Sequence, residues 1–413
     1  MGPKLGILVG GGPAPGINGV IAAATIEARN RGVPVVGILD GFRWLAQGRV
    51  EHAQPLEIAD VSRIHFRGGS ILRTSRTNPT RDPGAKRRVL DGLRSLGIGR
   101  LVSIGGDDTA FTASQLAHEA GGSIRIVHVP KTIDNDLPLP GGVQTFGFET
   151  ARHVGVSIVE TIMEDARATS RWYLLVAMGR KAGHLALGIG KAASATLTLI
   201  PEEFPGTAVP LSRVADIIEG SIVKRLATGQ ENGVAVIAEG VAECLDPADL
   251  TGIETAERDD HGHVRLSELP LGEVLKSELR ARLSARGLLL KIVAKDIGYE
   301  LRCADPIPFD AEYTRDLGYG AARYVLEGGS DAMITRQAGR IAPLPFSEML
   351  DPSTGRPRLR LVDTSAESYE VARKYMIRLS GEDVADPGRL KQLAESGRIE
   401  ADELRARYAD HSA

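Results

Sequence analysis

Hydrophobic positions follow two alternating spacings along the first third of the chain. Short apolar runs, each typical of a buried strand, cover residues 4–9, 33–38, 101–104 and 124–129. Apolar residues at helical spacing cover 17–24 and 109–120, after the first and third of these runs. A regular succession of strand and helix predicts a parallel sheet that is covered by helices.

A second alternation of the same kind begins near residue 145. Helical patterns cover residues 145–165, 182–193, 212–228, 271–286 and 311–327. Strand patterns cover residues 173–177, 196–199, 234–238, 289–294 and 332–335. The polar stretch 246–268 is predicted to be a surface excursion, and the last part of the chain, after residue 345, to be mostly helical. The expected architecture is therefore two α/β halves with a cleft between them.

Composition and charge exclude several classes of protein. The chain has 413 residues, a formal net charge of −3 and two cysteines. This charge gives no reason to expect nucleic acid or an anionic membrane as a partner, and no apolar run reaches the ~20 residues of a membrane span. Two cysteines make no disulfide framework, and a strand from Lys4 leaves no room for a signal peptide. We expect a cytoplasmic protein.

Two glycine-rich segments connect a predicted strand to a predicted helix. They are Gly-Gly-Gly-Pro-Ala-Pro-Gly at 10–16 and Gly-Gly-Asp-Asp-Thr at 105–109. Glycines let the backbone approach a phosphate, and a helix amino terminus offers free N–H groups to it. The alternative for Asp107 taken alone is a helix N-cap. The adjacent carboxylates of Asp107 and Asp108 repel each other, and a Mg²⁺ shared with substrate phosphates would relieve that repulsion.

The segment Pro-Lys-Thr-Ile-Asp-Asn-Asp at 130–136 follows another predicted strand. Side chains at the carboxyl ends of parallel strands face the crevice where open α/β sheets bind ligands. A phosphoryl acceptor hydroxyl needs a base within hydrogen-bond reach, and Asp134 or Asp136 can supply it. The alternative is an ordinary turn, because Asp and Asn favour turns.

Other candidate residues also lie at or near strand ends. Met-Gly-Arg at 178–180 and Glu239 follow apolar strands, and an arginine fork suits phosphate. Further candidates are Arg76, Arg171, Tyr299 and Arg302. Each of these four residues, taken alone, is also typical of a solvated surface.

Taken together, these motifs resemble the phosphofructokinase family in order and spacing, from about residue 4 to residue 345. Thr-Ile-Asp-Asn-Asp after Gly-Gly-Asp is the specific part of the resemblance. The family implies two Rossmann-like three-layer α/β/α domains with mostly parallel sheets and an interdomain cleft. It implies a phosphoryl-donor domain of residues 1–137 plus about 305–345, and a sugar-phosphate domain of residues 138–304 plus about 346–413.

The resemblance also implies roles for individual residues. Asp134 would take the proton from the 1-hydroxyl of fructose 6-phosphate, with Lys131 and Arg180 as the other catalytic residues and Asp107 holding Mg²⁺. The donor would contact Gly11, Gly106 and Asp108. The sugar phosphate would contact Thr132, Ile133, Asp134, Met178, Gly179, Arg180, Glu239, Tyr299, Arg302 and Arg76. Arg171 resembles the family arginine that reaches into a neighbouring subunit's site, which implies a homodimer or homotetramer.

Two positions depart from the family's bacterial ATP-using members. Asp108 and Lys131 each stand where those enzymes have glycine, and both resemble the diphosphate-dependent branch. A carboxylate at position 108 would repel a nucleotide's α-phosphate, since two charges ~4 Å apart cost about 4 kcal/mol at an effective dielectric of ~20. Lys131 adds a cation beside a small, highly charged leaving group.

The sequence therefore predicts a Mg²⁺-dependent diphosphate–fructose-6-phosphate 1-phosphotransferase, reversible and usable in glycolysis and gluconeogenesis. One alternative is an ATP-dependent 6-phosphofructokinase. Another is a non-catalytic regulatory subunit of the same fold, although such a subunit would be expected to lack Asp107, Asp134 or Arg180. Sedoheptulose 7-phosphate shares the reacting end of fructose 6-phosphate and stays open as an acceptor.

Overall fold

The computed structural model describes residues 2–204, 206, 208–250, 269–349 and 358–409. Within these residues the chain packs as two compact units. Unit 1 contains the described residues of Met1–Ala151 and Tyr299–Arg360, and unit 2 contains those of 152–298 and Leu361–Ala413. The predicted assignment of one domain to the donor and the other to the sugar phosphate stays a prediction.

Unit 1 is built on a mostly parallel sheet, as predicted. Its strands in the described residues are β1 (Lys4–Val9), β2 (Val35–Ile38), β3 (Ala53–Leu56), β4 (Ile98–Gly105), β5 (Arg125–Thr132), β6 (Phe146–Gly147), β11 (Ala332–Gln337) and β12 (Arg340–Pro345). The order is β12-β11-β5-β4-β1-β2-β3, with β6 paired to β5. Strands β3 and β12 run antiparallel to their neighbours, and neither was predicted from the apolar pattern. Each lies at one edge of the sheet.

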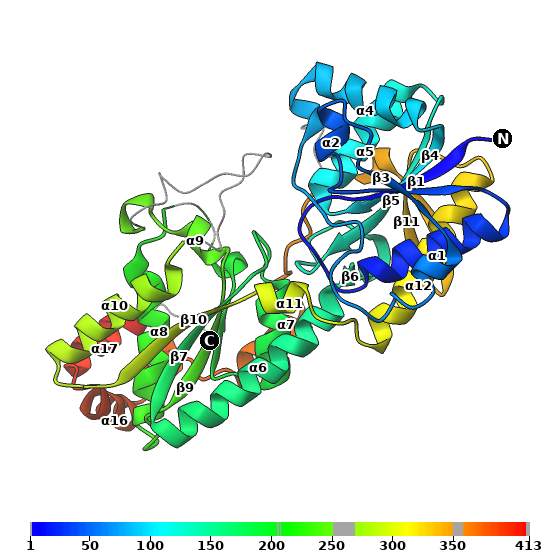
Figure 1. Cartoon of the computed structure of the whole chain (residues 1–413). Helices are drawn as coiled ribbons and strands as arrows, with labels where there is room; N and C mark the ends of the chain where they lie inside the picture. The colour runs from blue at the N-terminus through cyan, green and yellow to red at the C-terminus, as the bar shows by residue number, and fades with distance from the viewer. Residues whose placement is uncertain (1, 205, 207, 251–268, 350–357, 410–413) are drawn as a thin grey trace. The chain divides into compact units, whose positions relative to one another are not determined.

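Helices cover both faces of this sheet (Figure 1). They are α1 (Ile17–Asn30), α2 (Arg43–Ala46), α3 (Ile58–Val61), α4 (Pro83–Ser95), α5 (Asp107–Ala120), the first turn of α6 (Phe148–Thr169), α11 (Tyr299–Arg302), α12 (Pro308–Leu326) and α13 (Phe346–Met349). Leu5, Ile7 and Val9 alternate to one side of β1 and pack in a core with α1 and α12, which lie side by side. Leu8 points to the other side, into a core with α4 and α5.

The strand order places the two glycine-rich turns together. The chain runs from β1 to β2 on one side of β1, and β4 lies on its other side. The turns after β1 and β4 therefore flank the point where the strand order reverses, which is where open α/β sheets bind ligands.

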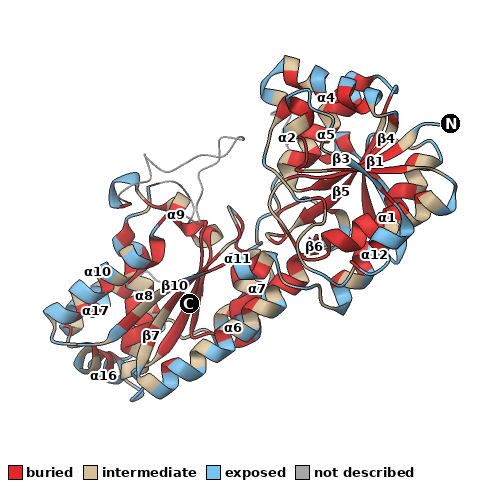
Figure 2. Ribbon diagram, in the orientation of Figure 1, coloured by how far each residue is buried: buried red, intermediate tan, exposed pale blue. Residues whose placement is uncertain are grey.

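Unit 2 has a parallel sheet whose described strands are ordered β10-β7-β9-β8. These strands are β7 (Arg171–Ala177), β8 (Leu197–Leu199), β9 (Gly233–Ala238) and β10 (Lys291–Ile297). Its described helices are the rest of α6, α7 (His184–Ala193), α8 (Leu211–Leu226), α9 (Val241–Cys244), α10 (Leu271–Ala285), α14 (Glu367–Tyr375), α15 (Gly381–Ala385), α16 (Pro387–Gly397) and α17 (Ala401–Tyr408). In each unit the inner strands form the buried centre (Figure 2).

The predicted helical character after residue 345 is confirmed by α13 to α17. Leu390, Leu393 and Tyr408 pack with Val223 of α8 in a small apolar core of unit 2. The predicted surface excursion at 246–268 lies mostly outside the described residues and stays a prediction. No helix among the described residues is long and apolar enough to cross a membrane.

Candidate active site

The glycine turn, residues 10–12, follows β1 and contains one position, Gly11, whose backbone only glycine adopts easily. Gly11 has φ 79° and its N–H donates to the Ser75 carbonyl at 2.9 Å. A Cβ atom at position 11 would lie 3.2 Å from Lys131 Nζ. The ammonium of Lys131 donates a hydrogen bond to the Gly12 carbonyl. Gly12 was not among the predicted site residues, although the run of three glycines was a signal for it.

Thr109 packs against both glycine-rich turns. It lies in the first turn of α5, and its side chain fills the space that Cβ atoms at Gly10 and Gly105 would occupy, at 2.5 Å and 2.3 Å. Gly106 is the N-cap of α5, and the partly exposed Asp107 and Asp108 form its first turn. The structure therefore brings Gly11, Gly106 and the two carboxylates to one end of the sheet.

Lys131 lies inside β5, which corrects the prediction that this strand ends at residue 129. Pro130 pairs with Gly105 of β4, and Lys131 and Thr132 pair with Phe146 and Gly147 of β6. The strand therefore continues for three residues beyond residue 129, to Thr132. Lys131 is 4% exposed. A buried ammonium is costly unless polar groups surround it, and the Gly12 carbonyl is one such group.

The acid loop, residues 133–136, begins directly after β5. Asp134 is partly exposed, and its N–H donates to Thr132 Oγ1 at 3.0 Å. Asn135 has φ 57°, in the left-handed region, and its Oδ1 accepts from the Thr145 N–H at 3.2 Å. Ile133, Asn135 and Asp136 are buried. Of the loop residues, Asp134 is therefore the acid that reaches solvent while its neighbours fix the backbone.

Two guanidinium groups approach the glycine turn. A Cβ atom at Gly12 would lie 3.4 Å from Arg302 Nη1 and 3.9 Å from Arg76 Nη2. Arg302 also stacks on the ring of Tyr299 in α11, at 4.5 Å from the ring centroid. Arg76, Tyr299 and Arg302 thus lie with the glycine turn in unit 1. Their predicted contact with a sugar phosphate stays a prediction.

The second group of predicted residues belongs to unit 2. The Arg180 loop, residues 178–180, follows β7, and Glu239 follows the neighbouring strand β9. Glu239 Oε1 accepts hydrogen bonds from the N–H groups of Gly179 at 3.2 Å and Arg180 at 2.9 Å. Glu239 is 6% exposed, and a Cβ atom at the next residue, Gly240, would lie 2.3 Å from the Arg180 carbonyl oxygen. Met178, Gly179, Arg180 and Glu239 therefore form one cluster.

Arg171 lies at the opposite end of β7 from the Arg180 loop. The strand has seven residues, so the two ends are about 20 Å apart at ~3.3 Å per residue. In the same chain, the Arg171 backbone therefore does not lie beside Arg180. The role of Arg171 in the site of another subunit, which the resemblance implies, stays a prediction.

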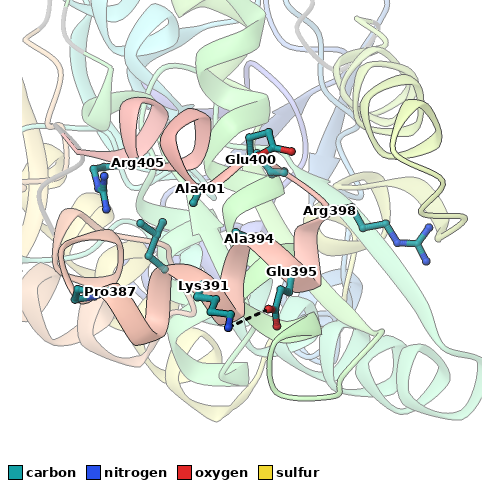
Figure 3. A pocket seen from close by; sticks show the side chains of 10 residues that line it. Pro387, Lys391, Ala394, Glu395, Arg398, Glu400, Ala401 and Arg405 are labelled. Carbon is teal, nitrogen blue, oxygen red and sulfur yellow. Dashed lines mark ion pairs between the residues drawn. The ribbon is translucent and has the colours of Figure 1, made fainter.

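A surface hollow lies far along the chain from these residues, on α16 and α17 (Figure 3). Its lining includes Lys391 and Glu395, which form an ion pair at 3.9 Å. None of the predicted site residues lines this hollow.

Comparison with known proteins identifies the family. The family model described as phosphofructokinase matches residues 4–325. The chain is 54% identical to the pyrophosphate–fructose 6-phosphate 1-phosphotransferase of Thermotoga maritima, over 99% of this chain and 98% of that protein. It is 50% identical to the protein of the same name from Naegleria fowleri, over 97% of this chain and 94% of the relative. The chain belongs to the phosphofructokinase family.

Solved structures agree on the fold. A pyrophosphate-dependent phosphofructokinase from Nitrosospira multiformis superposes with a TM-score of 0.69 at 19% identity, covering 91% of each chain. Phosphofructokinase from Saccharomyces cerevisiae superposes with a TM-score of 0.67 at 22% identity over 99% of this chain. The present chain spans about half, 48%, of that yeast chain. The predicted fold class is confirmed.

Proposed function

We propose that this protein catalyses the reversible transfer of a phosphoryl group from diphosphate to the 1-hydroxyl of fructose 6-phosphate, giving fructose 1,6-bisphosphate and phosphate. The observation that carries the proposal is the set of cations around the glycine turn. Lys131, Arg76 and Arg302 all bring side-chain nitrogens to Gly11 or Gly12, beside the strand that leads into the acid loop. A small, highly charged phosphoryl donor needs cationic side chains around it. The names of the two curated relatives support the same donor and acceptor.

Asp134 acts as the general base. Its carboxylate accepts the proton of the 1-hydroxyl as that oxygen attacks the nearer phosphorus of diphosphate. The new O–P bond forms while the P–O bond to the leaving phosphate breaks, and the electron pair of that bond stays with the phosphate. In the reverse direction, protonated Asp134 returns its proton to the sugar oxygen. Its partial exposure fits a group that must meet a substrate.

Cationic side chains stabilise the charge that moves in this step. Lys131 is held by the Gly12 carbonyl close to the glycine turn, where we place the diphosphate. Arg180 would bind the transferring group and the sugar phosphate, with Met178, Gly179 and Glu239 shaping its loop. Thr132 and Ile133 would contact the sugar phosphate, and Arg76, Arg302 and Tyr299 would contact it from the side of the glycine turn.

The carboxylates at the start of α5 fit a magnesium ion. Within the described parts of the chain, no group of three or more His, Cys, Asp or Glu side chains could hold a metal by itself. Mg²⁺ is commonly bound through one or two carboxylates together with substrate phosphates, so Asp107 would hold it with diphosphate oxygens. When bound, Mg²⁺ neutralises charge on the transferring group.

Asp108 decides the donor in this proposal. It lies in the first turn of α5, beyond the Gly106 N-cap, where an anionic nucleotide phosphate would meet its carboxylate. We expect Asp108→Gly to raise kcat/KM for ATP by about tenfold, since about 1.4 kcal/mol of lost repulsion is a factor of ten. Steady-state rates with ATP measure this, and an Asp108→Gly variant as inert to ATP as the wild type would contradict it.

A crossed assay tests the whole proposal. The purified protein is supplied with diphosphate or ATP, and with fructose 6-phosphate or sedoheptulose 7-phosphate, in the presence of Mg²⁺. We expect diphosphate with fructose 6-phosphate to give the highest kcat/KM. A higher value with ATP would make the protein an ATP-dependent 6-phosphofructokinase, and turnover of no pair would make it a non-catalytic subunit. A higher value with sedoheptulose 7-phosphate would change only the acceptor.

We also propose a homo-oligomer that acts in the cytoplasm. The position of Arg171, away from the Arg180 loop of its own unit, supports a role in a second subunit's site. The two free cysteines, Cys244 and Cys303, fit a reducing compartment. Mixing an Arg171→Ala variant with an Asp134→Asn variant would test the shared site, because a mixed oligomer could contain complete sites that neither parent has.

A further inference from the structure

Arg360 holds the acid loop from a distant part of the sequence. Its backbone N–H donates to the Asp136 carbonyl at 2.7 Å, and its Nε donates to the Asn135 carbonyl at 3.0 Å. Its Nη1 donates to the Val143 carbonyl at 2.7 Å, and its Nη2 donates to Asn135 Oδ1. One residue thus supplies four hydrogen bonds to a short segment that lies about 220 residues earlier in the chain.

These bonds satisfy groups that the sheet leaves unpaired. Asn135 and Val143 lie outside the strands, because β5 ends at Thr132 and β6 begins at Phe146. Buried backbone carbonyls need partners, and a planar guanidinium can serve several at fixed angles. Burial lowers the pKa of Arg360, while the nearby carboxylate of Asp136 raises it. Asp136 is 4% exposed, so Arg360 also supplies a cation to a buried acid.

Asn135 is fixed from two sides. A left-handed backbone is unfavourable for a residue other than glycine. Hydrogen bonds to the side chain and to the carbonyl of Asn135 offset this cost. Arg360 binds both its Oδ1 and its carbonyl oxygen, and the Thr145 N–H binds Oδ1 as well. Because Asn135 follows Asp134 directly, the same contacts restrict where the Asp134 carboxylate can point.

We propose that Arg360 is a positioning residue for phosphoryl transfer, which fixes the Asp134 carboxylate through the backbone of Asn135. The proposal rests on the proposed base role of Asp134. It gives the segment after residue 345, to which the family motifs assign no role, an indirect part in the reaction. A displacement of about 1 Å at a reacting group costs on the order of 100-fold in rate, which sets the expected size of the effect.

The central test is Arg360→Ala, assayed for kcat and for the KM of each substrate. We expect kcat to fall about 100-fold while both KM values stay within about threefold, because substrate binding does not need a precisely placed base. Added guanidinium, at a concentration far below that which unfolds the protein, should restore at least part of the lost kcat. Arg358→Ala is the matched control, since Arg358 is exposed and its hydrogen bond to the Met349 carbonyl uses only the backbone N–H.

A double variant separates positioning from a general loss of structure. If Arg360 acts through Asp134, then Asp134→Asn with Arg360→Ala should be no slower than Asp134→Asn alone. Losses that multiply, or an Arg360→Ala kcat within threefold of wild type, would overturn the proposal. If Asp134→Asn itself keeps turnover, the base role fails, and the positioning role fails with it. If Asp134→Asn is inactive while Arg360→Ala is fully active, only the positioning role fails.

Arg360→Lys keeps the test decisive if the alanine variant does not fold. Lysine retains a charge beside Asp136 but presents one compact ammonium in place of the planar fork. We expect a folded enzyme with kcat lowered at least tenfold and KM values unchanged. Wild-type kcat in this variant would show that the bonds to Asn135 are not needed.

Discussion

The acid loop of unit 1 and the Arg180 loop of unit 2 both follow parallel strands, but the side chains that anchor the two loops carry opposite charges. Backbone carbonyls of the acid loop accept hydrogen bonds from the cation Arg360. Backbone N–H groups of the Arg180 loop donate to the anion Glu239. In each loop the anchoring side chain has the charge opposite to the functional side chain that the loop carries. An anchor therefore fixes the backbone and also balances the charge that the loop brings to the site.

The comparison also assigns different kinetic roles to the two units. Unit 1 carries the base and Lys131, so changes at Asp134 and Lys131 should mainly affect kcat. Unit 2 carries the Arg180 loop, which is proposed to bind the sugar phosphate, so a change at its anchor Glu239 should mainly affect KM. The first three predictions below test this division.

The largest effect is expected at Asp134. Asp134→Asn keeps the size of the side chain and removes the proton acceptor, so kcat should fall by about 10²–10⁴-fold in both directions of the reaction. The KM for fructose 6-phosphate should change little. Steady-state kinetics in each direction measure both quantities, and a kcat within tenfold of wild type would remove Asp134 as the base.

The next largest effect is expected at Lys131. Lys131→Met fills a similar volume without the charge, and kcat should fall by about 10²–10³-fold because a preorganised cation is lost. Lys86→Met, on the surface of α4, is the control and should leave kcat unchanged, since its ion pair with Glu119 lies outside the proposed site. A rise in the KM for diphosphate with an unchanged kcat would assign Lys131 to ground-state binding instead.

A smaller effect, on a different constant, is expected at Glu239. Glu239→Gln keeps one oxygen acceptor for the Arg180 loop but replaces a charged hydrogen bond by a neutral one, a loss of about 1 kcal/mol. The KM for fructose 6-phosphate should rise about fivefold, with a smaller change in kcat. If kcat falls and KM does not change, the two units do not divide the work in this way.

The last prediction concerns stability, with no change expected in the kinetic constants, and it distinguishes the units by pH. His128 of β5 is fully buried between the Ser103 hydroxyl and the Gly105 carbonyl, and burial lowers its pKa from 6.5 to about 3. Because the unfolded chain binds this proton more readily, stability should fall as the pH drops below about 6.5 and continue to fall toward 3. The slope is up to about 1.4 kcal/mol per pH unit.

Hydrogen exchange at pH 7.5 and pH 5.5 would locate this loss. Backbone amides of β5 in unit 1 should lose protection at the lower pH, beyond the change seen for β7 in unit 2. His128→Gln should reduce the difference between the two pH values. Equal loss of protection in both strands would indicate that other groups govern the acid sensitivity.

Much of the fold could be predicted because it depends on local patterns. The apolar run at 4–9 matches β1, and the glycine and acid motifs lie at strand ends as predicted. The helix α4 was missed, although Asp82 followed by Pro83 is a typical helix start and Asp82 does accept from the Gly84 N–H. The edge strands β3 and β12 were missed because short edge strands carry little apolar signal.

The site was predicted less completely than the fold, for a physical reason. Asp134, Lys131 and Glu239 stand in local motifs that can be read directly from the sequence. The end of β5 depends on pairing with β6, and the hydrogen bonds of Arg360 join positions about 220 residues apart. No local pattern encodes a contact of that range, and Arg360 stands in a segment without a motif.

Among the described residues, unit 1 is made of two separate pieces of chain, which has a consequence for synthesis on the ribosome. Its central sheet lacks β11 and β12, and α1 lacks its partner α12, until roughly 190 residues after Ala151 have been translated. At about 5–20 residues per second, that delay is on the order of 10–40 s. During this time the apolar side of α1 that will meet α12 remains uncovered in the nascent chain. Early binding by a chaperone should therefore matter more for the first half of this chain than for the second.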